Sequence, residues 1–294
     1  MPKAKTRDGI HLSYEETGSG TPVIFVHEFA GDHRSWEPQM RYFARHYRCI
    51  AYAGRGYTPS DVPSSPEAYS YEHFRDDVIA VLDHLGLAKA HIVGLSMGGY
   101  SALQVGLKYP QRAISLTLAG TGSGSEYWSI DEFRKGASAT AQQFEKLGAA
   151  EFGKTYGASP GRIPFAVKDP RGYAEFVEQL SQHSAQGSAN TSRGFQGGRP
   201  SLYDFEKDIR QLALPTLIIV GDEDDPCIEP SLFLKQTIPA SGLAIFPKTG
   251  HAANLEEPAL FNATLGDFLA RAETGRWPPR DPRSIRPGNK SIIR

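Results

Sequence analysis

The sequence predicts an α/β fold in which a mostly parallel sheet is flanked by helices and interrupted by an inserted helical cap. The first observation is a series of short apolar runs at residues 23–26, 49–52, 91–93, 114–118 and 216–220. Continuous runs of this kind, without polar alternation, are typical of parallel strands that are covered on both faces. The second observation is the presence of amphipathic segments between the runs, which favours strand–helix–strand units with right-handed crossovers.

The clearest of these helical segments places apolar side chains at helical spacing, namely Phe74, Val78, Val81, Leu82 and Leu85. The third observation is a break in the alternation between residues 122 and 210. Helical patterns occur there, for example at 132–147 and 173–183, and Gly/Ser-rich loops at 121–125 and 193–199 interrupt the helical stretch. Because strand patterns lie on both sides of the break, an insertion between two strands is favoured over a trailing domain.

The predicted organisation therefore has three parts. Residues 1–121 and 211–272 form the α/β core, residues 122–210 form the helical cap, and residues 273–294 form a Pro/Arg-rich C-terminal extension. We expect this extension to be solvated or to lie against the surface, because it has little apolar periodicity.

Composition excludes several functional classes. The chain has 294 residues, 39% of them hydrophobic and 22% charged, with a formal net charge of −1. These values are typical of globular proteins, and nothing in the overall charge indicates nucleic acid or an anionic membrane. Two cysteines, Cys49 and Cys227, are too few for a disulfide framework, and no Cys/His pair has zinc-ligand spacing. The N-terminus lacks the apolar stretch of a signal peptide, so we expect a cytoplasmic protein.

A candidate nucleophile is Ser96, in Gly94-Leu95-Ser96-Met97-Gly98. The residues before it are predicted to form a strand and those after it a helix, which is the context of a nucleophile elbow. The pentapeptide alone is weak, because a Gly-rich turn with an ordinary serine has the same pattern.

The candidate base is His251, which follows a strand pattern at 243–246 and precedes a predicted helix. A base that serves Ser96 should lie at the carboxyl ends of the strands, where this loop belongs. An acid that orients the imidazole should come from the loop after residues 216–220, where Asp222, Glu223, Asp224 and Asp225 are all candidates. The backbone N–H of Met97 is one expected oxyanion donor, and the loop at 27–31 should supply the other.

With these motifs in their order, the sequence resembles the α/β-hydrolase fold superfamily over about residues 9–271. It is most similar to the group that contains enol-lactone hydrolases, haloperoxidase-like esterases and small carboxylesterases. The resemblance depends on the runs at 21–27, 55–61, 94–99 and 221–224 and on Gly250-His251. It implies that Asp224 is the acid, with Asp222 and Asp225 as alternatives, and that Phe29 carries the second oxyanion donor.

Two departures from the family pattern stand out. The family commonly has His-Gly in the oxyanion loop, where this chain has His27-Glu28. Glu28 is therefore either a substrate-binding carboxylate beside Ser96 or one half of a salt bridge with Arg34 or Arg55. Ala53 stands where the family often has Asp before Arg-Gly, so a structural hydrogen bond near the oxyanion loop is expected to be missing.

We therefore expect a serine hydrolase that cleaves a small carboxylic ester or lactone through an acyl-enzyme, without cofactor or metal. Carbon–carbon bond hydrolases, perhydrolases and hydroxynitrile lyases share the triad and stay open, as does a ligand-binding receptor on the same scaffold. The cap should determine substrate choice, with Trp128 among its candidate substrate-binding residues. Its basic and acidic residues are about balanced, so composition indicates no anionic substrate. No nucleic-acid or membrane partner is expected, and a homodimer is left open.

Overall fold

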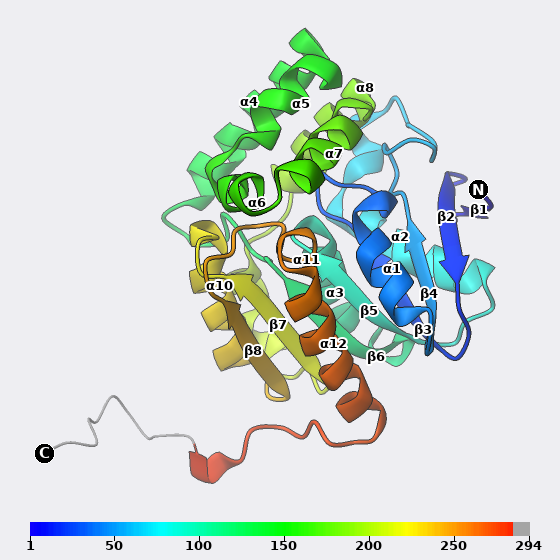
Figure 1. The fold of residues 1–294 in the computed structure, drawn as a ribbon, viewed down its shortest axis with the longest axis vertical. Coiled ribbons are helices and arrows are strands. Elements are labelled where there is room, and N and C mark those ends of the chain that lie inside the picture. Colours follow the sequence, from blue (N-terminus) through cyan, green and yellow to red (C-terminus); the bar gives the residue numbers. More distant parts are fainter. Residues whose placement is uncertain (285–294) are drawn as a thin grey trace, which may run out of the picture.

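The computed structural model describes residues 1–284, and an eight-stranded sheet crosses the centre of this part (Figure 1). The strands lie in the order β1-β2-β4-β3-β5-β6-β7-β8. Strands β3 to β8 are parallel, while β2 pairs antiparallel with β4 and with β1. The predicted mostly parallel sheet is therefore confirmed. The strands are β1 (Lys3–Lys5), β2 (His11–Thr17), β3 (Thr21–Val26), β4 (Tyr47–Tyr52), β5 (Ala90–Leu95), β6 (Ala113–Ala119), β7 (Thr216–Gly221) and β8 (Ser241–Phe246).

The apolar runs did not indicate β1 and β2. β1 is a three-residue strand at the edge of the sheet, and the last three residues of β2, which include Glu15 and Glu16, are exposed, so no continuous apolar run marks either strand. The parallel strands β5 and β7, by contrast, are buried along their whole length. This explains why their continuous apolar runs predicted them from the sequence.

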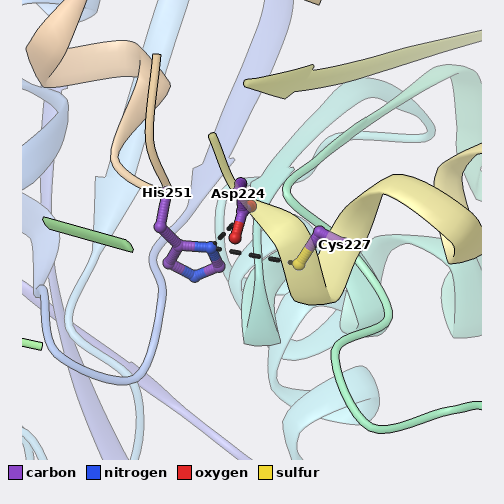
Figure 2. A group of neighbouring side chains, drawn as sticks. All are labelled: Asp224, Cys227 and His251. Atoms are coloured by element: carbon purple, nitrogen blue, oxygen red, sulfur yellow. Dashed lines mark hydrogen bonds and ion pairs between the residues drawn. The ribbon is translucent and has the colours of Figure 1, made fainter. Parts of the chain in front are cut away.

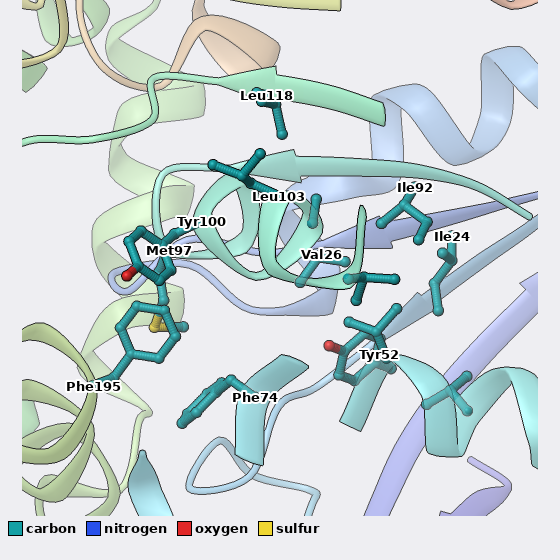
Figure 3. Packing of buried hydrophobic residues seen from close by; sticks show 14 of the residues in the cluster. Ile24, Val26, Tyr52, Phe74, Ile92, Met97, Tyr100, Leu103, Leu118 and Phe195 are labelled. Carbon is teal, nitrogen blue, oxygen red and sulfur yellow. The ribbon is translucent and has the colours of Figure 1, made fainter. Parts of the chain in front are cut away.

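Helices cover both faces of the sheet, as alternate side chains of the strands require. One face packs against α1 (Glu37–Phe43) and α12 (Pro258–Glu273), with Phe25 against Trp36 and Phe43. The other face packs against α2 (Tyr71–His84), α3 (Met97–Lys108) and α10 (Asp225–Thr237). Figure 3 shows this second core, in which Ile24 and Ile92 of the sheet lie close to side chains of α2 and α3.

The helices α4 to α8, which lie between β6 and β7, form the cap, shown in green beyond one end of the sheet in Figure 1. They are α4 (Ile130–Leu147), α5 (Ala149–Gly157), α6 (Ile163–Lys168), α7 (Pro170–Ser181) and α8 (Ala185–Thr191). A π-helical turn at Ser192–Gln196 follows α8, whereas the sequence predicted a loop at 193–199. Phe195 explains the difference, because its buried ring packs edge-on against Phe74 and Tyr100 of the core (Figure 3).

The remaining helical segments are short. They are the 3-10 turns His33–Trp36, Pro66–Tyr69, Pro110–Arg112, Pro160–Arg162, Leu202–Phe205 and Pro282–Ser284, and the helices α9 (Glu206–Ile209) and α11 (Ala253–Glu256).

The C-terminal extension is only partly within the described residues. Glu273 is still the last residue of α12, and Trp277 then packs on Phe268 while its Nε1 donates to the Ala240 carbonyl. The segment from 274 to 284 therefore begins against the surface of the core. The expectation for residues 285–294 lies outside the described residues. Within residues 1–284, none of the helices has the length and apolar character needed to cross a bilayer.

Candidate active site

Ser96 occupies the sharp turn between β5 and α3. Its backbone has φ 54° and ψ −111°, a left-handed conformation that is strained for a residue with a side chain. The turn is tight enough that a Cβ on Gly94 would lie 2.2 Å from the Gly98 carbonyl oxygen, and one on Gly98 would lie 2.0 Å from that of Val26. Only glycine fits at both positions. The two glycines of the pentapeptide therefore allow the strand, the helix and β3 to close up around a partly exposed serine.

Asp224 and His251 meet at the end of the sheet, although 27 residues separate them. The Asp224 Oδ2 to His251 Nδ1 distance is 2.8 Å, and Asp224 is buried. Burial by itself lowers the pKa of His251, but the charges of Asp224 and Glu28 outweigh it and raise that pKa above the ordinary value of 6.5. The carboxylate thus holds the imidazole in one orientation and stabilises its charged form.

The other carboxylates of the same loop have different environments. Asp222 is exposed and accepts from the backbone N–H of Thr249, while Glu223 pairs with Lys248 at 3.3 Å. Asp225 is exposed in the first turn of α10. Of the four candidates in the sequence, the structure places only Asp224 against His251.

The loop that carries Phe29 is held by two buried aromatic groups. His27 is neutral, because burial lowers its pKa to about 4. Its Nδ1 lies 2.7 Å from the Glu28 carbonyl and its Nε2 accepts from Gly54 N–H at 2.9 Å, which fixes the tautomer with the proton on Nδ1. The Tyr57 hydroxyl donates to the Phe29 carbonyl at 2.9 Å. These bonds fix the backbone of Glu28 and Phe29 beside the nucleophile turn.

Glu28 forms a buried ion pair with Arg162, which comes from the cap. The guanidinium is bidentate: Nη1 donates to Oε1 at 2.8 Å and Nη2 donates to Oε2. Burial raises the pKa of Glu28, but the charges of Arg162 and His251 outweigh it, so the pKa lies below its ordinary value. The sequence suggested Arg34 or Arg55 as partner, and both are engaged elsewhere, Arg34 with Asp32 and Arg55 with Asp8 and Asp77.

Glu28 also faces the base. Its Oε2 lies 3.8 Å from His251 Nε2. Among residues 1–284, Ser96 Oγ makes no hydrogen bond to that nitrogen. His251 thus lies between two carboxylates, Asp224 at Nδ1 and Glu28 near Nε2. Of the two interpretations that the sequence left open, Glu28 does form a salt bridge, but with Arg162 in place of Arg34 or Arg55. It also lines the cavity, and its role in substrate binding stays a prediction.

The cap also holds the His251 loop from above. The His251 N–H donates to the Gly161 carbonyl at 2.7 Å, one residue before Arg162. Lys168 of α6 lies 3.0 Å from the buried Glu256 carboxylate, which accepts from Gly250 N–H. The position of the cap is thus coupled to the backbone on both sides of the base.

Cys227 lies beside Asp224 and His251, as Figure 2 shows. Its Sγ lies 4.0 Å from His251 Nδ1 and donates to the Gly120 carbonyl at 3.2 Å. Burial raises the thiol pKa well above its ordinary value, so the sulfur is neutral and unreactive. Asp224, Cys227 and His251 are the one set within residues 1–284 whose ligand atoms are close enough to share a metal ion. A metal there would have to break the Asp224–His251 hydrogen bond, so the donors fit a proton-handling pair better.

A cavity of about 990 Å³ opens above these groups. It is lined by Ser96, His251, Glu28 and Phe29 from the core and, among others, by Phe133, Tyr156, Arg162 and Arg199 from the cap. Trp128 does not line it: this side chain is 72% exposed and borders a separate shallow depression. The structure thus brings the other predicted site residues together but leaves Trp128 outside.

Sequence reasoning missed Arg162, Gly161, Cys227 and Arg199. Arg162 and Gly161 follow Ser159-Pro160, a turn signal in the middle of the predicted helical cap. Arg199 likewise stands in Gly197-Gly198-Arg199-Pro200. Such Pro- and Gly-containing turns could have indicated where the helical insertion approaches the site. They could not have indicated which core residue each arginine contacts.

Comparisons with known proteins agree with this architecture. The model of the alpha/beta hydrolase fold family matches residues 21–258. The 3-oxoadipate enol-lactonase 1 of Acinetobacter baylyi is 29% identical over 266 residues, covering 90% of this chain and 94% of that protein. The malate-bound structure of a thermophilic esterase from Thermogutta terrifontis has a TM-score of 0.81 at 26% identity, covering 92% and 98% of the two chains. The enol-lactonase of Burkholderia xenovorans LB400 has a TM-score of 0.76 at 20% identity, covering 92% and 100%, which supports the fold alone.

Proposed function

Since the chain belongs to the alpha/beta hydrolase fold family, we propose that it is a serine hydrolase that cleaves a small carboxylic ester or lactone through an acyl-enzyme. The observation that carries this proposal is the convergence of three separate loops on one cavity. Ser96 follows β5, Asp224 follows β7 and His251 follows β8, and all three line the cavity together with the loop of Phe29.

Each group has a role that its surroundings support. Ser96 Oγ attacks the carbonyl carbon and gives its proton to His251 Nε2. The backbone N–H groups of Phe29 and Met97 bind the oxyanion of the tetrahedral intermediate. His251 then returns the proton to the leaving oxygen as the carbon–oxygen bond breaks. In the second half a water molecule gives a proton to His251 as it attacks the acyl carbon. His251 then passes that proton to Ser96 Oγ as the bond between Oγ and the acyl carbon breaks, which releases the acid and restores Ser96.

Glu28 is assigned to the substrate-binding side of the site. Its ionised carboxylate, held by Arg162 and 3.8 Å from His251 Nε2, stabilises the imidazolium that forms in both halves of the reaction. It also excludes acyl groups that place negative charge at the same point. Glu28 thus acts as a positioning residue for the base as well as a wall of the cavity.

The proposal is tested with activated esters such as p-nitrophenyl acetate and butyrate and with a simple lactone. The native enzyme should release product and be labelled by a fluorophosphonate at Ser96. Ser96→Ala should lose both properties, with kcat reduced by on the order of 10³-fold or more. Retention of most activity by Ser96→Ala would overturn the proposed mechanism.

The same experiment, with a vinylogous diketone added to the substrates, separates other functions that the triad permits. Labelling of Ser96 without turnover of any ester or lactone would favour a ligand-binding receptor. Turnover of a vinylogous diketone in preference to esters would favour a carbon–carbon bond hydrolase. The location in the cytoplasm and the oligomeric state expected from the sequence stay predictions beside this proposal.

A further inference from the structure

Arg199 differs from the other buried arginines of the chain. Three arginines are buried within residues 1–284, namely Arg55, Arg162 and Arg199. Arg55 pairs with Asp8 and Asp77, and Arg162 pairs with Glu28. Arg199 is 7% exposed, yet no carboxylate of the described residues lies within ion-pair distance of it. Because a buried charge is costly unless it is paired, this exception requires an explanation.

The contacts of Arg199 satisfy only part of its guanidinium. In the described part of the chain its one side-chain hydrogen bond runs from Nη2 to the Ser123 carbonyl. The buried Nε has no acceptor there. The rings of Tyr100 and Phe133 lie on the guanidinium, each with its centroid 4.9 Å from Cζ. Ring faces weakly stabilise a cation but provide no hydrogen-bond acceptor of the strength of a carboxylate.

Arg199 lines the same cavity as Ser96 and His251. It also lies close to Cys227, whose thiol pKa the charge of Arg199 lowers, although burial raises that pKa by more. Cys227 Sγ in turn lies 4.0 Å from His251 Nδ1, so Arg199 lies near His251. Its backbone is well fixed: the Arg199 N–H donates to Phe195, and the next carbonyl, that of Pro200, accepts from the Tyr100 hydroxyl at 2.9 Å. The unpaired cation is therefore held in place before any ligand arrives.

We propose that Arg199 is an anion subsite of the cavity, so that the substrate is an ester or lactone that carries a carboxylate. The planar guanidinium, of which only Nη2 has an acceptor among the described residues, matches a carboxylate by charge-assisted hydrogen bonding. Arg162 cannot have this role, because Glu28 already occupies both of its terminal nitrogens. The balanced charge of the cap did not reveal the subsite, since composition does not show which arginine is paired. The assignment rests on the proposed ester hydrolysis and deepens it.

The test compares two sets of activated esters: the mono-p-nitrophenyl esters of succinate, glutarate and adipate, and the same three molecules with the free carboxylate neutralised as its methyl ester. For at least one chain length, the native enzyme should prefer the anionic ester, with a kcat/KM about ten- to hundredfold above that of its methylated form. Arg199→Gln should reduce this ratio at least tenfold, chiefly through KM. Arg199→Lys should restore part of it, because the charge returns without the planar fork.

Arg193→Gln is the matched control, because Arg193 belongs to the same segment but pairs with Glu145 and does not line the cavity. It should leave the ratio unchanged. Thermal unfolding of each variant checks that it folds, and the free dicarboxylate should inhibit the native enzyme more strongly than Arg199→Gln.

The failures of the two proposals are distinguishable. Two results would overturn the subsite and leave the hydrolase proposal intact. One is hydrolysis of the methylated esters with no preference for any anionic ester. The other is a loss of kcat/KM in Arg199→Gln that is equal for the anionic and the methylated esters. No hydrolysis of either kind would overturn the hydrolase proposal itself. In that case, binding of the free dicarboxylate by calorimetry still decides the subsite, because equal binding by the native protein and Arg199→Gln would refute it.

Discussion

The ion pair between Glu28 and Arg162 allows a sharp prediction, because both charges are buried and both face the base. Two unit charges about 4 Å apart attract by about 4 kcal/mol at an effective dielectric of 20. Removing one partner of a buried pair costs about 3–5 kcal/mol, since the other charge stays buried without compensation. We therefore expect Arg162→Met and Glu28→Gln each to lower the free energy of unfolding by about 3 kcal/mol. The double variant should lose far less than the sum, because it leaves neither charge unpaired.

The same pair should move the pH profile in opposite directions. The charge of Glu28 raises the pKa of His251 and that of Arg162 lowers it. Because His251 must be neutral to accept the Ser96 proton, the acid limb of kcat/KM reports the pKa of His251 in the free enzyme. Glu28→Gln should move this limb to lower pH, whereas Arg162→Met should move it to higher pH. The double variant should lie between the two.

Urea unfolding measures the free energy of unfolding of each variant. The hydrolysis of p-nitrophenyl esters across pH measures the acid limb of kcat/KM. Arg193→Met is the matched control, since it breaks a solvent-exposed pair with Glu145 and should cost less than about 1 kcal/mol without moving the limb. The reasoning is refuted if the two single variants shift the limb in the same direction. Losses in unfolding free energy that simply add in the double variant would refute it as well, because the two charges would then not be coupled.

Three further predictions concern the neighbouring groups. Asp224→Asn should keep the fold but reduce kcat by on the order of 10⁴-fold, because the amide favours the wrong tautomer of His251; steady-state kinetics test this, and a loss below about tenfold would contradict it. Tyr57→Phe should cost about 1–3 kcal/mol by leaving the buried Phe29 carbonyl without its donor, and should lower kcat with little change in KM; full activity in that variant would mean that Tyr57 does not position the oxyanion loop. Cys227→Ala should keep kcat within about threefold, because the buried thiol is neutral and takes no proton in the reaction; inactivation of the native enzyme by a small alkylating reagent at neutral pH, absent in the variant, would argue against this.

The native pH dependence follows from the raised pKa of His251. The kcat/KM of the native enzyme should fall as pH decreases through a midpoint above the ordinary histidine value of 6.5, because the protonated base cannot activate Ser96. A rate profile that stays flat below that value would show that His251 does not act as the base.

The sequence by itself determined the middle of the sheet and the turn that carries Ser96, because both depend on neighbouring residues. Buried strands such as β5 and β7 need continuous apolar runs, and the turn at Ser96 needs glycine at 94 and 98, whatever the rest of the chain does. Strands β1 and β2 lacked such a signal, since β1 is a three-residue edge strand and the last three residues of β2 are exposed. The domain limits at residues 122 and 210 stay predictions from the same patterns.

Only the tertiary structure decided which charges meet. The resemblance to a known family distinguished Asp224 from three neighbouring carboxylates. Its 2.8 Å contact with His251, however, forms only because the fold brings two loops together. Arg162 lies 134 residues from Glu28, and nothing near either residue identifies the other as its partner. The same holds for Arg199, whose importance comes from the lack of a partner within the described residues. Local patterns specify strands and turns, whereas the pairing of buried charges depends on the packing of the cap over the core, and that packing shapes the cavity above Ser96.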